Sequence, residues 1–171
     1  MIALPLPDPA LIVLMGASGA GKSTLAAALA AQHPDAVVVS YDACRKEISG
    51  DESNQAVTEQ AVTLALRRIR ERCLQRRTTI VDGTHTRLDQ RTSLASLAAW
   101  YRIPAVLIAV ATPLELCLAR QNQRARHVPA DVVTQQHGDV LRALTHRGLA
   151  DGYAQVHIVG LDGQAGFVTS P

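Results

Sequence analysis

The sequence has few aromatic side chains, only two lysines and no cysteines in a recognisable pairing pattern. Aromatic residues make up 3% of its 171 residues, so a domain of this length must build its core from leucine, valine, isoleucine and alanine. Cys44, Cys73 and Cys117 are odd in number and widely spaced, which disfavours a disulfide framework and does not match a C-x-x-C zinc site. We expect small buried thiols and a reducing, cytoplasmic compartment.

Long apolar stretches are missing as well. The apolar run at residues 10–15 is too short to cross a membrane, and no basic segment precedes it. A strand is therefore expected there, in place of a signal peptide or a membrane span. The formal net charge is +2, and Lys22 and Lys46 are the only lysines among 17 basic side chains. This mildly basic balance does not by itself indicate nucleic acid, although arginine binds phosphate groups bidentately.

Short apolar segments alternate with helical patterns along the chain. Strands are predicted at residues 11–15, 36–40, 78–82, 105–111 and 155–159, and helices at residues 22–32, 55–75, 88–101, 114–124 and 131–147. The strands are almost continuously apolar, as in strands that are buried on both faces. The alternation predicts an α/β fold with a doubly wound, parallel, five-stranded sheet and helices on both faces. One domain is expected over residues 1–159, with a helical lid at about 120–130 and a C-terminal tail at 160–171.

A glycine-rich motif separates the first predicted strand from the first predicted helix. Residues 16–23 match G-x-x-x-x-G-K-S, and in this context the loop holds a triphosphate such as that of ATP with its backbone N–H groups and the helix dipole. Lys22 is expected to reach the β- and γ-phosphates, and the Ser23 hydroxyl is expected to bind Mg²⁺. The predicted nucleotide-binding residues of this P-loop are Gly16, Ser18, Gly19, Ala20, Gly21, Lys22, Ser23 and Thr24.

Two polar residues follow the second predicted strand. Asp42 comes at its carboxyl end, where ligands gather in open α/β sheets, and Arg45 lies one helical turn later on the same face. A carboxylate there accepts the proton of an attacking hydroxyl, and a cation beside it holds an anionic group of the acceptor. A solvated ion pair with a capping aspartate is the alternative. We predict that Asp42 and Arg45 are catalytic, together with Lys22, and that they bind the acceptor.

The third predicted strand ends in Asp82, which is followed by a glycine. Asp82 is predicted to support Mg²⁺ or its water ligands, with an ordinary Asp-Gly turn as the alternative. Thr84, His85 and Arg91 follow and are predicted to face the acceptor. For Arg91, a solvated helix face explains the sequence equally well.

Two arginine clusters are also present. Arg120 and Arg124 share one helix face and Arg126 follows; because like charges at this spacing repel, they predict a lid that closes over the triphosphate, with Arg120 also stabilising the transferred group. A basic solvated helix is the alternative. The second cluster lies on the helix at 55–75, where a solvated face is favoured over a polynucleotide track that would make binding salt-sensitive. It consists of Arg67, Arg68, Arg70, Arg72, Arg76 and Arg77.

Together, these motifs resemble the 5′-hydroxyl polynucleotide kinase family, in particular the kinase module of bacterial end-healing enzymes. The resemblance covers about residues 11–159. It rests on the G-x-x-G-x-G-K-S-T loop, the S-x-D-x-C-R segment followed by Asp51 and Glu52, the V-D-x-T segment and the R-x-x-x-R-x-R-x-V-P lid. It departs from the family at residues 81–85, which read V-D-G-T-H where the family usually has V-D-A-T-N.

The resemblance implies transfer of the γ-phosphate of ATP, with Mg²⁺, to a 5′-hydroxyl end of RNA or DNA. It implies phosphate and Mg²⁺ binding by Lys22 and Ser23, a general base at Asp42, a contact from Arg45 to the 3′-phosphate of the acceptor, and nucleotide contacts from Arg120 and Arg124. The phosphatase and ligase modules of the bacterial enzymes have no counterpart in this sequence, so either a free-standing kinase or one module is expected.

Two other classes of protein remain open. A small-molecule kinase for an antibiotic, a sugar or a nucleotide sugar would share the architecture, because the fold is widely reused. A non-catalytic NTP-binding switch would need the phosphate loop but not Asp42, Arg45 and Arg120 together. The sequence does not indicate an oligomeric state.

Overall fold

A computed structural model describes residues 4–124 and 127–160 of the chain. Arg126 of the predicted lid and residues 161–171 of the predicted tail therefore lie outside the described residues. Five parallel strands form one sheet in the order β2-β3-β1-β4-β5. They are β1 (Leu11–Met15), β2 (Val37–Ser40), β3 (Thr79–Asp82), β4 (Ala105–Val110) and β5 (Gln155–Val159).

The helices connect consecutive strands, as a doubly wound fold requires. They are α1 (Lys22–Gln32), α2 (Tyr41–Ser49), α3 (Thr58–Leu74), α4 (Leu88–Trp100), α5 (Leu114–Asn122) and α6 (Ala130–Thr145), with 3-10 turns η1 (Gln55–Val57) and η2 (Arg147–Ala150). The predicted α/β class, the parallel sheet and its helical layers are confirmed, and the predicted ends differ from these by a few residues. Helix α2 was not predicted as a separate element, although Arg45 was placed one helical turn after Asp42.

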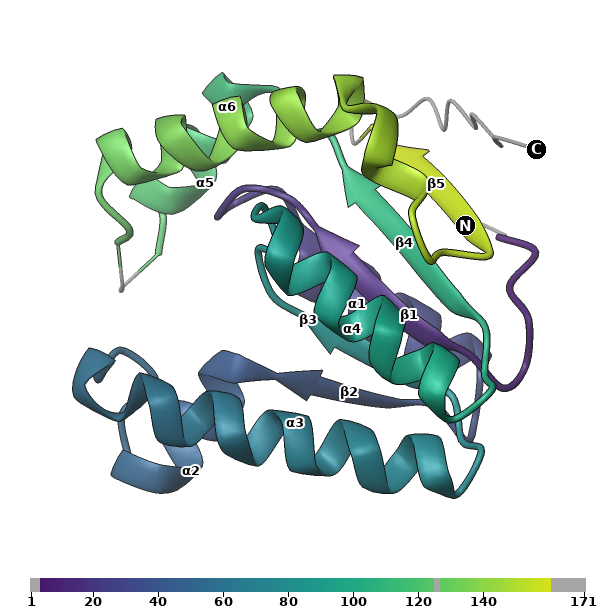
Figure 1. Cartoon of the computed structure of the whole chain (residues 1–171). Helices are drawn as coiled ribbons and strands as arrows, with labels where there is room; N and C mark the ends of the chain where they lie inside the picture. Colours follow the sequence, from purple (N-terminus) through teal and green to yellow (C-terminus); the bar gives the residue numbers. More distant parts are fainter. Residues whose placement is uncertain (1–3, 125–126, 161–171) are drawn as a thin grey trace.

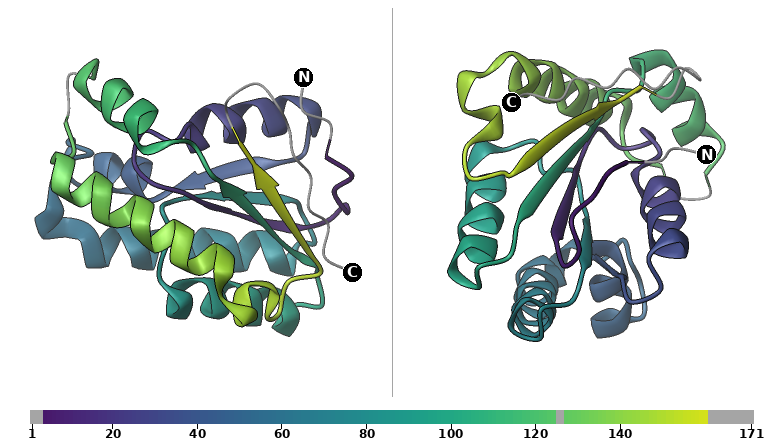
Figure 2. Two further views of the ribbon diagram at one scale, coloured as in Figure 1. Left: turned by 90° about the horizontal axis from the view of Figure 1, so that it is seen from above. Right: turned by 90° about the vertical axis from the view of Figure 1, so that its right-hand side faces the viewer.

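The two faces of the sheet are covered by different helices (Figures 1 and 2). Side chains of β1 alternate between the faces: Leu11 and Val13 join a core built with α3 and α4, whereas Ile12 and Leu14 join a core built with α1 and α5. This alternation follows from the two-residue repeat of a strand. Because β1 is the central strand and is buried on both faces, it holds the loop that follows it on a rigid base.

The three thiols are buried, as predicted, and are not joined in a disulfide: Cys44, Cys73 and Cys117. Each of them packs into one of the two cores. Among the helices of the described residues, none combines the length and the apolar character that crossing a membrane requires.

Candidate functional site

The glycine-rich loop leaves β1 and wraps around the start of α1. Gly19 and Gly21 have φ values of +83° and +98°, in the left-handed region that glycine adopts without strain. A Cβ atom on Gly19 would lie 2.4 Å from the carbonyl oxygen of Cys117 in α5, so no other residue fits there. Gly16 N donates to the carbonyl of Thr84 at 3.0 Å, which ties the loop to the segment after β3.

Lys22, the first residue of α1, is folded back onto the loop. Its side-chain Nζ donates to the carbonyl of Ala17 at 2.8 Å, and the residue is only 8% exposed. Burial lowers the pKa of Lys22 to about 8, an effect that Asp82 opposes and that Arg124 reinforces. The buried ammonium therefore lacks a full counter-charge, and a bound phosphate would supply one.

This arrangement predicts proton uptake when ATP binds. Because phosphate oxygens stabilise the charged lysine, ATP should raise the pKa of Lys22 above about 8, its value in the protein without ATP. At pH 8.5, calorimetry in buffers of different ionisation enthalpy should show uptake approaching one proton per ATP, with much less at pH 7. A Lys22→Arg variant keeps the charge without titrating and should show no such uptake. Equal proton counts in the two proteins at pH 8.5 would contradict the lowered pKa.

The two residues predicted to bind Mg²⁺ contact each other. Ser23 Oγ donates to Asp82 Oδ2 at 2.8 Å across the gap between α1 and the end of β3. Mg²⁺ usually takes one or two protein oxygens and completes its shell with water and phosphate oxygens. A hydroxyl and a carboxylate beside the phosphate loop fit this preference, so Ser23 and Asp82 are the residues that would hold the ion.

Asp42 and Arg45 form an ion pair on the first turns of α2. The Asp42 side chain is 53% exposed, whereas that of Arg45 is 12% exposed and its Nε donates to the carbonyl of Glu52 at 2.9 Å. Helix α2 begins here because Ser40 caps it and accepts from Ala43 N at 3.4 Å, and because Asp42 lies at the positive end of its dipole. The arginine is therefore fixed and the carboxylate remains accessible.

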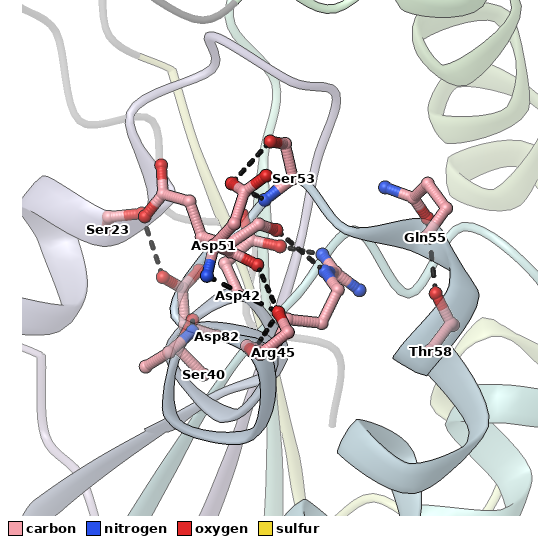
Figure 3. A network of polar contacts seen from close by, with 12 residues as sticks. Ser23, Ser40, Asp42, Arg45, Asp51, Ser53, Gln55, Thr58 and Asp82 are labelled. Atoms are coloured by element: carbon pink, nitrogen blue, oxygen red, sulfur yellow. Dashed lines mark hydrogen bonds and ion pairs between the residues drawn. The ribbon is translucent and has the colours of Figure 1, made fainter.

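The register of the sheet brings these groups to one corner of the molecule. Ser40 of β2 pairs with Asp82 of β3, so Asp42 emerges two residues beyond the strand position that adjoins the Ser23–Asp82 contact. In Figure 3, the side chains of Ser23, Asp82, Asp42 and Arg45 gather in one polar network. The structure thus brings the phosphate loop, the candidate metal ligands and the candidate base together.

The prediction that His85 faces the acceptor is wrong for this structure. Its ring is 2% exposed, its Nδ1 hydrogen-bonds to the carbonyl of Leu14 at 2.7 Å, and it packs edge-on against Tyr41 with ring centres 5.5 Å apart. Burial lowers the pKa of His85 to about 4, so the ring is neutral. A Cβ atom on Gly83 would lie 2.7 Å from His85 and 2.9 Å from Tyr41, which explains the glycine before it.

Arg91 occupies neither of the positions considered from the sequence. It is 3% exposed, and its Nη1 donates to the carbonyls of His85 and Thr86 at 2.9 and 2.7 Å. Its main role is to hold the connection between β3 and α4. Arg91 also lines a pocket of about 180 Å³ between α4 and α6, together with Asp139, Arg142 and His146 among others. Thr84 is half-buried and contacts the phosphate loop through its backbone.

The two described lid arginines differ in their contacts. Arg120 Nη1 lies 3.4 Å from the carbonyl of Gly19 and 3.5 Å from that of Ala20. It therefore already reaches the phosphate loop. Arg124 is exposed just beyond the end of α5, close enough to lower the pKa of Lys22. Both can approach an anion on the loop.

Two residues that support the loop were missed from the sequence. The buried Thr112 hydroxyl donates to the carbonyl of Ala20 at 2.7 Å. Gln136 of α6 accepts from Ser18 N at 2.9 Å. Neither residue belongs to a local motif, and their partners lie 92 and 118 positions away in the chain, so nothing in the sequence near them identifies the contact.

The AAA domain family matches residues 11–146. The chain belongs to this family. The matched segment contains the phosphate loop, the Asp42–Arg45 pair and the described lid arginines. No curated protein matches the chain.

Solved structures show where this fold occurs. The structure of the Pnkp1/Rnl/Hen1 RNA repair complex is 19% identical with a TM-score of 0.70 and covers 81% of this chain and 46% of that chain. The crystal structure of AvrRxo1-ORF1:-ORF2 with ATP is 20% identical with a TM-score of 0.70, and the match covers 95% of this chain and 57% of that chain. A gluconokinase from Sinorhizobium meliloti 1021 is 20% identical with a TM-score of 0.59, and the match covers 94% of this chain and 87% of that chain. The chain therefore has a P-loop NTPase fold, which supports nucleotide binding.

Proposed function

We propose that this protein is an ATP-dependent kinase that phosphorylates the 5′-hydroxyl end of RNA or DNA. The observation that carries the proposal is the Asp42–Arg45 pair, which lies at the same corner as the Ser23–Asp82 contact. Mg²⁺, held there by Ser23 and Asp82, would neutralise charge on the β- and γ-phosphates.

Asp42 supplies the base in this proposal. Its carboxylate is half exposed and lies one strand away from Asp82, so an incoming hydroxyl can donate its proton to Asp42 while its oxygen attacks the γ-phosphorus. Phosphoryl transfer requires mainly positioning and charge stabilisation. Lys22 and Arg120, both in contact with loop carbonyls, supply positive charge as the bond to the leaving ADP oxygen breaks.

Arg45 supports a phosphate-bearing acceptor. Its side chain is fixed by Asp42 and by the carbonyl of Glu52, so little side-chain entropy is lost when an anion binds. In a polynucleotide, the nearest anion to the 5′-hydroxyl is the phosphate on the 3′ side of the same nucleotide. A cation beside the base is therefore the contact that a 5′-hydroxyl end requires.

A small anionic acceptor is the second candidate. The pocket of about 180 Å³ between α4 and α6 is lined by Arg142, which pairs with Asp139, and by His146. A guanidinium and an imidazole suit a carboxylate or phosphate of a metabolite. The gluconokinase whose fold is similar has nearly the same extent as this chain. A sugar acid is thus the metabolite class to offer beside an oligonucleotide.

The deciding measurement is a transfer assay with labelled ATP and two kinds of acceptor. With a 5′-hydroxyl oligonucleotide, wild-type protein should form a labelled 5′-phosphate. Arg45→Ala should raise the acceptor KM about tenfold or more, because a charge-assisted contact is lost, and should change the ATP KM much less.

Arg68→Ala is the matched control. Arg68 lies on α3 and pairs at 2.8 Å with Glu47, which is on the same helix α2 as Arg45. Arg68 is not part of the polar network around Asp42. This variant should keep the wild-type acceptor KM. Transfer to a sugar acid and not to the oligonucleotide would replace the proposal with the small-molecule kinase, and nucleotide binding without any transfer would favour a switch.

A further inference from the structure

An exposed aromatic and basic surface lies at the end of the sheet opposite the phosphate loop. Trp100, the one tryptophan of the sequence, is 82% exposed at the end of α4, and Leu74 is 71% exposed at the end of α3. Exposed arginines accompany them along the same two helix ends. We name this set the distal surface: Arg70, Leu74, Arg76, Arg77, Trp100 and Arg102.

The two helix ends that carry the distal surface lie next to each other. Arg76 follows α3 by two positions and Arg102 follows α4 by two positions, and Arg76 Nη1 donates to the carbonyl of Arg102 at 3.5 Å. Figure 1 shows both helices ending at the same side of the molecule. Residues that are distant in the sequence thus form one surface.

Both helices end in an unusual way. Arg76 and Arg102 have φ values of +53° and +54°, at the position after the helix cap where glycine is preferred because it adopts this conformation without strain. The backbone bonds of a Schellman motif are present in both, with Arg77 N on Arg72 O and Ile103 N on Ala98 O. An arginine therefore occupies, in both helices, a position where backbone conformation alone favours glycine.

The charge of the distal surface is mainly positive. The sequence has no aspartate or glutamate at residues 72–81 or 90–114, the two segments that carry most of the distal surface. Glu71 is the nearest acid in the sequence, and its described ion pair is with Arg67 at 3.8 Å. In space, Asp8 accepts from the Thr78 hydroxyl beside Arg77, and Asp35 lies close enough to act on Arg72. Arginines around an exposed indole fit a single-stranded polynucleotide, whose bases stack on aromatic faces and whose phosphates bind guanidinium groups.

We propose that the distal surface binds the polynucleotide tract that trails from the 5′ end, with one base stacked on Trp100 and the backbone on its arginines. This inference rests on the proposed kinase function, because it concerns the same substrate. It adds a second contact region that makes acceptor length matter.

Helix α3 connects the two regions. It starts beside the polar network of Figure 3 and its 17 residues span about 25 Å. Thr63, Arg67, Arg70 and Leu74 repeat at helical spacing on its exposed face. A hollow of about 460 Å³ between α2 and α3 is lined in part by Thr63 and Arg67. At 3.4 Å per nucleotide, a stacked strand needs about seven nucleotides to cover this length.

A partner protein is the competing occupant, since tryptophan and arginine are also enriched at protein interfaces. The distal surface has two large apolar side chains beside four arginines. A protein would have to bring matching carboxylates, whereas a nucleic acid backbone carries its anions at every position. The charge pattern therefore favours a polynucleotide over a partner protein as the occupant of the distal surface.

The fluorescence of Trp100 gives a readout that does not depend on catalysis. A 5′-phosphorylated single-stranded 15-mer, offered without ATP, should quench the emission of the one tryptophan, and binding should weaken with salt. An Arg70→Gln/Arg77→Gln variant should lower the log–log salt slope by about 0.7 per arginine removed. Arg147→Gln, an exposed arginine in η2 next to the opposite edge strand β5, should leave the slope unchanged. Absent quenching, or equal slopes in all three proteins, would overturn the proposal and leave a protein-docking surface.

Acceptor length separates this inference from the proposed function. Trp100→Ala should raise the KM of a 5′-hydroxyl 15-mer about tenfold and should leave the KM of a 5′-hydroxyl dinucleotide and kcat unchanged. If no oligonucleotide is phosphorylated but quenching persists, the kinase proposal fails and the distal surface stands. If the 15-mer and the dinucleotide are phosphorylated with the same KM, the kinase proposal stands and the distal surface fails.

Discussion

Replacing Asp42 with asparagine is expected to lower kcat for phosphoryl transfer by about 10²–10⁴-fold while the Kd for ATP changes little. Asparagine keeps the size of the side chain but cannot accept the proton of the attacking hydroxyl. ATP binding should persist because the phosphate loop is held by Thr84, Thr112 and Gln136, none of which is changed. Single-turnover rates with saturating acceptor, together with ATP titrations, measure the two quantities.

The control for Asp42 is Asp89→Asn. Asp89 also lies in the first turn of its helix and pairs with an arginine, Arg87, at 2.8 Å, so the change in charge and in helix-dipole interaction is the same. It should keep wild-type kcat. A wild-type rate in the Asp42 variant would remove Asp42 from the role of base, and a large loss in both variants would point to a general effect of charge.

Replacing Lys22 with methionine is expected to abolish measurable transfer, a loss of at least 10²–10³-fold, and yet to stabilise the nucleotide-free protein. Removing an ammonium that is 8% exposed relieves its desolvation, and we expect the free energy of unfolding at pH 7 to rise by about 1–3 kcal/mol. Denaturant titrations of the two proteins measure this difference. Lys46→Met, at an exposed lysine of α2, is the control and should change the free energy of unfolding by about 0.5 kcal/mol or less.

The stabilisation should depend on pH in one direction. Burial lowers the folded-state pKa of Lys22 to about 8 from 10.5, so below pH 8 the folded protein holds a charged lysine that the unfolded chain solvates better. Between pH 8 and 10.5 the unfolded state binds more protons, and wild-type stability therefore rises with pH. The advantage of Lys22→Met should shrink over that interval. An advantage that grows with pH would contradict the assigned cause.

The fold could be predicted because its signals are local. Each strand is a short apolar run and each of the long helices repeats its apolar residues at helical spacing, as Ala61, Ala65 and Ile69 do. Helix α2 was not predicted as an element because eight of its nine residues are not fully buried, so no apolar repeat marks it in the sequence. Its start depends on the Ser40 cap and its end on Gly50 at φ +77°, which are signals of single residues.

The placement of the candidate site residues could be predicted where a polar residue follows a strand end, and could not be predicted where it depends on distant packing. Asp42 and Asp82 follow buried strands, and parallel strands deliver their carboxyl ends to one edge. His85 and Arg91 have side chains that could serve a substrate equally well. Only the three-dimensional contacts with Leu14, and with the carbonyls of residues 85 and 86, show that both hold the framework under the site.

The close packing around Gly83 constrains how this site can change in evolution. The rings of His85 and Tyr41 fill the volume that a methyl group would take, so a lineage that gains alanine at this position must first acquire a smaller neighbour two residues later. Packing therefore couples the two positions. Relatives with alanine at the position of Gly83 should have a side chain shorter than histidine at the position of His85. A protein that combines alanine at the first position with histidine at the second should fold poorly.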